Sequence, residues 1–387
     1  WMSREERVSP PSYRWIIVSL LFLATTNNYY NRIILSIVIP EVKRDLSLTD
    51  IQYSYIVSAF QFSYMIGMLV AGMHGFSGSA GLLGLWRGFL GLSEAGNFPG
   101  AIKSVSEWFP ERERSFATSI LNSGPNVALI TGAPVIAFLT LKFGWRGAVI
   151  IIGSTGILLM AAWLIFYRKE TPYAGTASST QQKIPWHRLF KHPETYGIMI
   201  GKFLTDPVWW FYLFWLPNYL NAERGYDIKQ IAVAVPLIYI IATLMGILGG
   251  WLPGWFMKQG WTLLKARKTT MLIFASMLPF TIYAVYAENV WVSVLFVGLA
   301  CGAHTGWSNN ILTLSGDQFP SQAVGSVTGL GGFAGGLGGL LLTSALVGYI
   351  VTYIGYFPIF ILMGIMHPTA MLCIHLLIRK NRQIESV

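Results

Sequence analysis

Residues 81–101 read GLLGLWRGFLGLSEAGNFPGA, an apolar run long enough to cross a membrane that nevertheless carries two full charges, Arg87 and Glu94. Charged side chains at lipid depth are costly, and proteins keep them only where they face a bundle interior or a water-filled cavity. Seven residues make almost two helical turns, so these side chains share one face and lie about 10 Å apart along the axis. The pair therefore indicates an ion, proton or substrate pathway.

The composition of the whole chain is that of a membrane protein. Of the 387 residues, 53% are hydrophobic and 11% are charged, whereas about 25% are charged in soluble domains. Apolar runs of about 20 residues predict an all-α polytopic fold with spans near 14–36, 50–72, 80–108, 115–141, 147–167, 194–220, 229–257, 269–287, 289–316, 322–351 and 355–378. Cys301 and Cys373 both lie in such runs, so they indicate no disulfide framework.

The basic residues cluster in loops and near the two ends of the chain. Because cytoplasmic loops carry excess lysine and arginine, we expect both termini to be cytoplasmic, and the net charge of +10 does not indicate nucleic acid. Eleven spans cannot place both termini on one side. The conflict falls at residues 73–80, since eight helical residues reach about 12 Å and the bilayer core is about 30 Å thick. One crossing helix is therefore expected to be absent between spans two and three.

An internal repeat gives the size of this gap. The Phe-Pro pair at 109–110 recurs at 319–320, each followed at the same spacing by a threonine, which is an offset of 210 residues. The small residues at 71–72 correspond to 249–250 at an offset of only 178. The first half is thus shorter by roughly 32 residues, about one helix and a loop.

Twelve spans in two related six-helix halves, joined by a long basic loop, is the organisation of major facilitator transporters. The halves are residues 1–167, in which the third span is largely missing, and residues 194–387. Residues 168–193 join them and are rich in proline, glycine, serine and glutamine, which predicts a cytoplasmic linker.

Five stretches carry a more specific resemblance. They are NYYNR at 28–32, RGFLGLSEAGNFPGAIKSVSEWFPERER at 87–114, DPVWWFYLFWLP at 206–217, KARKT at 265–269 and HTGWSNN at 304–310. Together they resemble the anion:cation symporter family of the major facilitator superfamily, and within it the bacterial hexuronate transporters. The resemblance implies symport of protons and a sugar-acid anion across the bacterial inner membrane, into the cell. A hexuronate such as glucuronate or galacturonate is the implied substrate, an aldonate such as galactonate is the alternative, and we expect a monomer without a cofactor.

The best candidate for binding the substrate carboxylate is Arg32 in span one. Its guanidinium is a planar fork of donors that matches a carboxylate bidentately and stays charged at any working pH. Tyr29 lies three residues earlier on the same face. Gln61 and Tyr64 repeat that spacing in span two, and together with Asn122 they offer hydrogen bonds to sugar hydroxyls. The alternatives are interhelical hydrogen bonds for these polar side chains and neutralisation of a buried acid for Arg32.

Glu94 is the candidate proton carrier, because the proton affinity of a buried carboxyl depends on burial and on nearby charges and so changes with the state of a transporter. We expect Arg87 to stabilise its deprotonated form; the alternative is a static structural pair. The 210-residue offset pairs Glu94 with His304, which titrates near physiological pH. His304 is therefore a candidate second coupling or substrate group, unless it is a neutral histidine bonded to a neighbouring helix. Trp307 and Asn310 follow it in three-residue steps and are the candidates for contact with the sugar ring.

Several residues point away from this scheme or are interpreted as structural. The family pattern has an acid before the arginine of span one, whereas this chain has Asn31, which cannot ionise; a proton-independent facilitator or exchanger therefore remains an alternative. Lys202 and Asp206 are interpreted as a local ion pair four residues apart, and the tryptophans that follow as packing residues. Outside the spans no nucleophile–base set, metal cluster or nucleotide loop is visible in the sequence, so we expect neither an enzyme nor a metal site.

Overall fold

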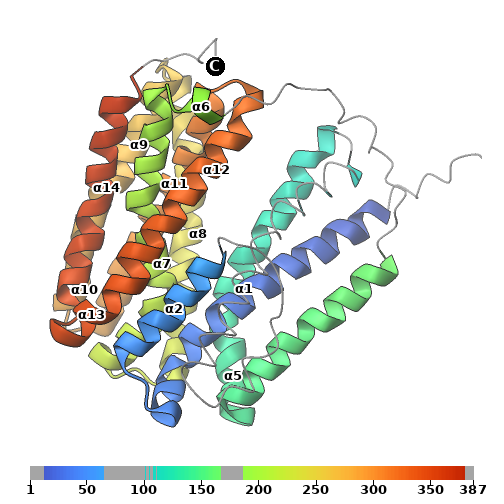
Figure 1. Ribbon diagram of the computed structural model, residues 1–387, viewed down its shortest axis with the longest axis vertical. Coiled ribbons are helices and arrows are strands. Elements are labelled where there is room, and N and C mark those ends of the chain that lie inside the picture. The colour runs from blue at the N-terminus through green and yellow to red at the C-terminus, as the bar shows by residue number, and fades with distance from the viewer. Residues whose placement is uncertain are drawn as a thin grey trace, which may run out of the picture.

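The computed structural model describes residues 13–64, 111–166 and 186–379, together with positions 101, 104, 108 and 109, and within these residues it contains helices and no strand. Six of the described helical stretches are long and apolar enough to cross a membrane. The prediction of an all-α polytopic fold is confirmed (Figure 1). Arg87 and Glu94 lie outside the described residues.

The described elements fall into two groups along the chain. The N-terminal half contains α1 (Tyr13–Leu46), α2 (Asp50–Tyr64) and α5 (Glu111–Phe166). The C-terminal half contains α6 (Trp186–Leu189), α7 (Pro193–Arg224), α8 (Ile228–Lys258), α9 (Leu263–Met277), η2 (Leu278–Ile282), α10 (Tyr283–Tyr286), α11 (Val290–Gln318), α12 (Ser321–Gly338), η3 (Gly339–Ala345), α13 (Leu346–Tyr353) and α14 (Phe357–Leu377). Apolar length alone thus predicted α11 and α14 to within two residues at each end.

The element α5 holds two predicted spans. Gly144 within it has φ 71° and ψ 168°, a conformation that is essentially restricted to glycine, so the helix is interrupted there. Figure 1 shows the parts before and after this point as separate rods that meet at one end of the molecule. The predicted spans 115–141 and 147–167 are therefore confirmed as two helices.

The helix starts confirm the internal repeat. Thr49 and Gln52 cap α2 reciprocally, since Gln52 N donates to Thr49 Oγ1 at 3.2 Å and Thr49 N donates to Gln52 Oε1 at 2.9 Å. Asp227 and Gln230 form the same arrangement at α8, at 2.8 and 3.0 Å. Reciprocal caps of this kind fix where a helix begins. The two caps lie 178 residues apart, so α2 and α8 are equivalent elements.

The second offset is confirmed by a pair of aromatic contacts. Just before α5 and α12, which start 210 residues apart, Phe109 and Phe319 are fully buried. Phe109 packs edge to face on Trp15 at 5.2 Å, and Phe319 packs edge to face on His192 at 6.2 Å. The halves thus agree at two points whose offsets differ by 32 residues. The shortfall lies in the interval that holds α9 and α10 in the C-terminal half.

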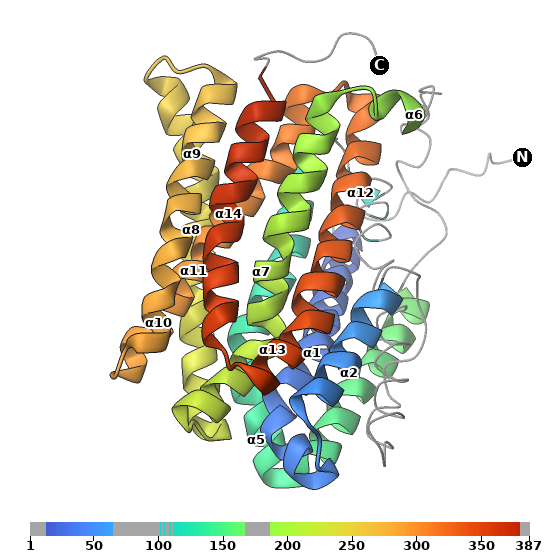
Figure 2. The same cartoon turned by 60° about the vertical axis from the view of Figure 1, so that its left-hand side comes forward.

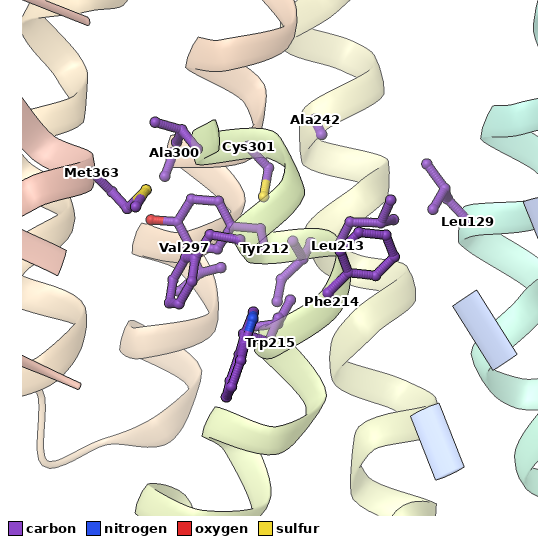
Figure 3. Close-up of a cluster of buried hydrophobic side chains, with 14 of the residues drawn as sticks. Leu129, Tyr212, Leu213, Phe214, Trp215, Ala242, Val297, Ala300, Cys301 and Met363 are labelled. Atoms are coloured by element: carbon purple, nitrogen blue, oxygen red, sulfur yellow. The ribbon is translucent and has the colours of Figure 1, made fainter. Parts of the chain in front are cut away.

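The C-terminal half is packed around α7. Figure 3 shows Tyr212 and Trp215 of this helix among Val297, Ala300 and Cys301 of α11, and all five are buried. Because lipid chains are as apolar as these side chains, the fit between the helices, more than removal from water, fixes their positions.

The two halves are joined at the end of the molecule opposite the C terminus. Lys43 Nζ of α1 lies 2.9 Å from Asp50 Oδ1 and 3.4 Å from Asn218 Oδ1 of α7. Asn218 Nδ2 in turn donates to Asp50 Oδ1 at 3.0 Å and to Tyr356 OH at 2.6 Å. Toward the other end, α1 and α5 diverge from the helices of the C-terminal half (Figure 1). We call the joined end the closed end.

We expect the closed end to depend on Gly348 of α13. A Cβ there would lie 2.3 Å from Ser54 Cβ and 2.8 Å from the carbonyl oxygen of Asp50, both in α2. Gly348→Ala must therefore push α13 away from α2, and overpacking of this kind costs about 1–3 kcal/mol. Thermal melting of the detergent-solubilised protein should show a lower apparent Tm for this variant than for the wild type.

Gly336→Ala in α12 is the matched control, because a Cβ at Gly336 would meet nothing within 4 Å. Both substitutions gain the same helix propensity, about 1 kcal/mol, so the difference between their melting temperatures reports the contact at Gly348. Equal melting temperatures would contradict the packing of α13 on α2.

Candidate functional site

A cavity of about 290 Å³ lies between the two halves. Its walls come from α1 and α5 of the N-terminal half and from α7 and α11 of the C-terminal half. The lining residues are Tyr29, Arg32, Pro125, Asn126, Leu129, Lys202, Asp206, Trp209, Trp210, His304, Thr305, Ser308 and Asn309. The volume is at the small end of the range for ligand pockets, and it suits a small polar molecule.

A larger hollow of about 660 Å³ lies at the closed end, where α1 meets the turn between α7 and α8. Arg44, Asp227 and Lys229 line it and are exposed. We place the functional site in the smaller cavity, because buried ionisable groups inside a membrane protein are the ones that mark pathways.

Arg32 is the charged group that the N-terminal half contributes to the cavity. Its side chain is buried, and the guanidinium carbon lies 4.6 Å from the ring centre of Tyr29 and 5.6 Å from that of Trp210. A cation at these distances from ring faces is stabilised by their electron density. The predicted shared face of Tyr29 and Arg32 is confirmed. The contact with Trp210 of α7 places the guanidinium at the boundary between the halves.

Lys202 and Asp206 of α7 form a buried ion pair, with Lys202 Nζ 2.9 Å from Asp206 Oδ2. The local pair predicted from the sequence is confirmed, and the structure adds that it lines the cavity. Helix α12 packs directly on this pair. A Cβ at Gly335 would lie 1.9 Å from Asp206 Oδ2, and one at Gly331 would lie 3.1 Å from Lys202 Cδ. Only glycine lets α12 come this close.

His304 of α11 lies in the cavity wall and is one of a pair of buried histidines. Its ring stacks on Trp209 with a centroid distance of 5.6 Å and an interplanar angle of 19°. Its Nδ1 lies 3.3 Å from Nε2 of His367 in α14, so one of these nitrogens carries the proton that they share. Sequence reasoning missed His367, although a histidine within the apolar run 355–378 was the signal that could have revealed it.

The structure places Trp307 and Asn310 away from the cavity, contrary to their expected orientation. Asn310 Nδ2 donates to the carbonyl oxygens of Gly249 and Gly306 at 2.8 and 2.9 Å. Trp307 is fully buried and packs edge-on against His367 at 5.4 Å. The reason is helix geometry: at about 100° per residue, a four-residue step stays closer to the direction of His304 than a three-residue step does.

The residues of α11 that reach the cavity follow this four-residue step. Ser308 lies one such step after His304, and Asn309 lies one after Thr305. Asn126 of α5 and the two tryptophans Trp209 and Trp210 also line the cavity, and sequence reasoning had assigned the tryptophans to packing. Their positions depend on how α7 faces α1, which no local pattern reveals.

The other candidates are placed less fully. Asn31 is buried, and its Nδ2 donates to the carbonyl oxygen of Asn27 one turn earlier in α1 at 2.9 Å. Gln61 and Tyr64 belong to the last turn of α2 and Asn122 to α5, but their side chains lie outside the described part of the structure. Among the described residues no group of three or more histidine, cysteine or acidic side chains could hold a metal ion.

Comparison with known proteins places this geometry in a family. The sequence profile described as the Major Facilitator Superfamily matches residues 71–343. The hexuronate transporter of Escherichia coli (strain K12) is 27% identical over 413 residues, covering 96% of this chain and 95% of that protein. The probable galactarate/D-glucarate transporter GudP of Bacillus subtilis (strain 168) is 30% identical over 404 residues, covering 89% and 87%.

Solved structures agree on the fold. A bacterial homolog of the human lysosomal transporter Spinster, in an inward-facing and occupied conformation, superposes with a TM-score of 0.77 at 16% identity, over 97% of this chain and 99% of that one. The alignment with the Escherichia coli relative is longer than this 387-residue chain. That relative therefore has residues without a counterpart here, as the shorter first half requires. The chain belongs to the Major Facilitator Superfamily and is a multi-pass membrane transporter, not an enzyme.

Proposed function

We propose that the protein imports a sugar-acid anion together with protons, by alternating access, across the inner membrane of a bacterium. The preferred substrate is a hexuronate such as glucuronate or galacturonate, in keeping with the name of the Escherichia coli relative. The observation that carries the proposal is the position of Arg32, a buried guanidinium of one half that faces Trp210 of the other across a small cavity. The basic loops favour cytoplasmic termini, and we propose a monomer.

The cavity offers each part of a sugar acid a partner. In the proposed complex the carboxylate binds the guanidinium of Arg32 through two parallel hydrogen bonds. The apolar face of the sugar packs on Tyr29 and Trp210, and its hydroxyls bond to Asn126 and Ser308. Gln61, Tyr64 and Asn122 remain proposed hydroxyl ligands. We propose that Trp307 and Asn310 act indirectly, by holding α11 in place behind His304.

The arrangement of the halves supports alternating access. A substrate in the cavity contacts elements of both halves, which are joined at the closed end by the polar cluster around Asn218 and diverge at the other end (Figure 1). Rocking of one half against the other around a central site is the general scheme of such transporters. Breaking the cluster at the closed end and closing the open end would expose the same cavity to the opposite side.

We propose that the Lys202–Asp206 pair takes part in proton coupling. While Asp206 is ionised it occupies Lys202 at 2.9 Å; when it takes up a proton, the ammonium becomes available to the anion. His304 and Arg32 face this pair across the cavity, and the tyrosine nearest to Arg32 is Tyr29.

The elements around the pair are otherwise poor in ionisable groups. The α12 residues that pack on it are glycines, α8 contributes Tyr239 behind Trp209, and α14 contributes His367 behind His304. We propose His304 as a second coupling group and Glu94, assisted by Arg87, as the counterpart in the N-terminal half.

The alternatives are an aldonate such as galactonate as substrate, or a facilitator or exchanger without proton coupling. Asn31 favours the second alternative, since an amide cannot carry a proton in place of a carboxyl. Uptake of labelled glucuronate, galacturonate and galactonate into proteoliposomes, with and without an inward proton gradient, tests both. Gradient-independent uptake by the wild type and by Asn31→Asp would contradict symport.

We expect Arg32→Lys to reduce glucuronate uptake strongly, because an ammonium cannot make the paired hydrogen bonds of a guanidinium. Loss of one charged hydrogen bond corresponds to roughly a tenfold to hundredfold loss of affinity. Initial uptake rates in proteoliposomes measure the effect. Arg44→Lys is the control, since Arg44 is exposed at the closed end and pairs with Glu41. Intact substrate binding in Arg32→Lys would contradict the bidentate role.

We expect Asp206→Asn to abolish gradient-driven accumulation and to retain exchange of internal for external glucuronate. Asparagine imitates the protonated carboxyl, so Lys202 can bind the anion at any pH but no proton is released. Accumulation and exchange in the same proteoliposomes separate the two steps.

The matched control is Asp227→Asn at the start of α8, where asparagine caps a helix as well as aspartate does. Accumulation by Asp206→Asn at the wild-type level would exclude this carboxyl from coupling.

We expect Ser308→Ala and Asn310→Ala to differ in kind, although the two residues are close neighbours in α11. Ser308 lines the cavity, so its loss should weaken glucuronate binding about fivefold, the equivalent of one hydrogen bond, without changing the melting temperature. Asn310→Ala removes two buried hydrogen bonds and should lower stability by about 1–3 kcal/mol. Titration of glucuronate against tryptophan fluorescence and thermal melting give the two readouts. The reverse pattern would restore Asn310 as the substrate ligand.

A further inference from the structure

A second cavity, of about 390 Å³, lies outside the transport pathway between α9 and α14. Figure 2 shows these two helices side by side, with α14 ending near the C terminus. Helix α9 contributes Lys265, Lys268 and Leu272 to this groove, and α14 and the residues after it contribute Met371, His375 and Arg379. It shares no lining residue with the central cavity.

The groove changes character along its length. On each helix the lining residues recur at steps of three or four, so they form a continuous stripe. Leu272 and Met371 lie at the end nearer the membrane interior, and the side chain of Leu272 is exposed to the surroundings of the bundle. The cationic residues lie at the end nearer the membrane surface. Apolar walls that lead to a cationic rim match the shape of a phospholipid, with acyl chains below a charged headgroup.

The cations of the groove are occupied by neutral acceptors. Lys268 Nζ contacts the carbonyl oxygens of Ile378 and His375, the latter at 3.5 Å, and Arg379 Nε donates to the carbonyl of Leu376 at 2.7 Å. Lys265 lies 4.2 Å from the ring centre of Trp261.

A carboxylate is present nearby but is already paired. Asp317 Oδ2 lies 2.5 Å from Arg267 Nε, and neither residue lines the groove. The groove lining contains no acidic side chain. Three cations and a histidine are therefore gathered at the edge of a membrane helix pair with an anion as their natural complement.

We propose that this groove binds an anionic phospholipid, with the headgroup phosphate held by Lys265, Lys268 and Arg379 and an acyl chain lying along Leu272 and Met371. Basic pockets between membrane helices at the cytoplasmic side bind anionic headgroups through this combination of charge and depth. A lipid is favoured over free phosphate because the groove continues into apolar surface below the cations. The proposal goes beyond transport and does not depend on the identity of the substrate.

The test uses the full-length chain in detergent, titrated with phosphatidylglycerol, phosphatidylethanolamine or inorganic phosphate while the melting temperature is followed. Ligands that bind only the folded protein raise its melting temperature. We expect phosphatidylglycerol to raise it, and the other two at equal concentration to have little effect. An equal rise with phosphatidylethanolamine would overturn the proposal, and so would a full rise with phosphate alone.

Variants locate the site. Each of Lys265→Gln and Arg379→Gln should weaken the phosphatidylglycerol effect about fivefold, since a basic residue near anionic lipid contributes about 1 kcal/mol. The double variant should lose most of it. Lys258→Gln is the matched control, because Lys258 is an exposed cation at the end of α8 that does not line the groove. A double variant that responded as the control does would overturn the assignment.

Discussion

Full charges at membrane depth are the constraint on which the rest of this structure depends, because an ion in an apolar medium is tolerated only when it is paired or solvated by polar groups. Lys202 and Asp206 satisfy it by pairing at 2.9 Å. Arg32 is held against aromatic rings from two helices. Both solutions demand close neighbours: glycines that let α12 approach the ion pair, and a tryptophan of α7 that meets α1. A few charged side chains thus limit how the apolar helices can be arranged.

The contacts within the C-terminal half differ in kind from those across the cavity. A Cβ at Gly249 would lie 2.4 Å from the Cα of Gly306, and one at Gly338 would lie 2.1 Å from the carbonyl oxygen of Phe203. Backbones this close cannot slide past one another without clashes, so α7, α8, α11 and α12 move together. Across the cavity the contact at Arg32 is made through side chains, which can separate and meet again. The fold therefore favours motion of one half against the other over deformation of either half.

The sequence predicted what is periodic or local and missed what depends on the orientation of helices. Apolar length predicted the spans, and the repeat predicted the offsets that the caps at Thr49 and Asp227 confirm. The Lys202–Asp206 pair was foreseen as a local contact, but its place in a cavity follows from the way α7 faces α1. The wrong face of α11 was chosen at Trp307, because a three-residue and a four-residue step are both plausible neighbours on a helix and only the position of α8 decides between them.

In the proposed coupling scheme, the Lys202–Asp206 pair has an advantage over a lone carboxyl as a proton site. The environment of the pair, glycine backbone on one side and aromatic rings on the other, disfavours any net local charge. Two states avoid it: ionised Asp206 with no anion on Lys202, and protonated Asp206 with a substrate carboxylate on Lys202. The two mixed states each leave one charge without a partner at membrane depth, so they are rarely populated. Anion and proton then enter and leave together without any direct contact between them, and an exposed ion pair could not enforce this because water would stabilise the mixed states.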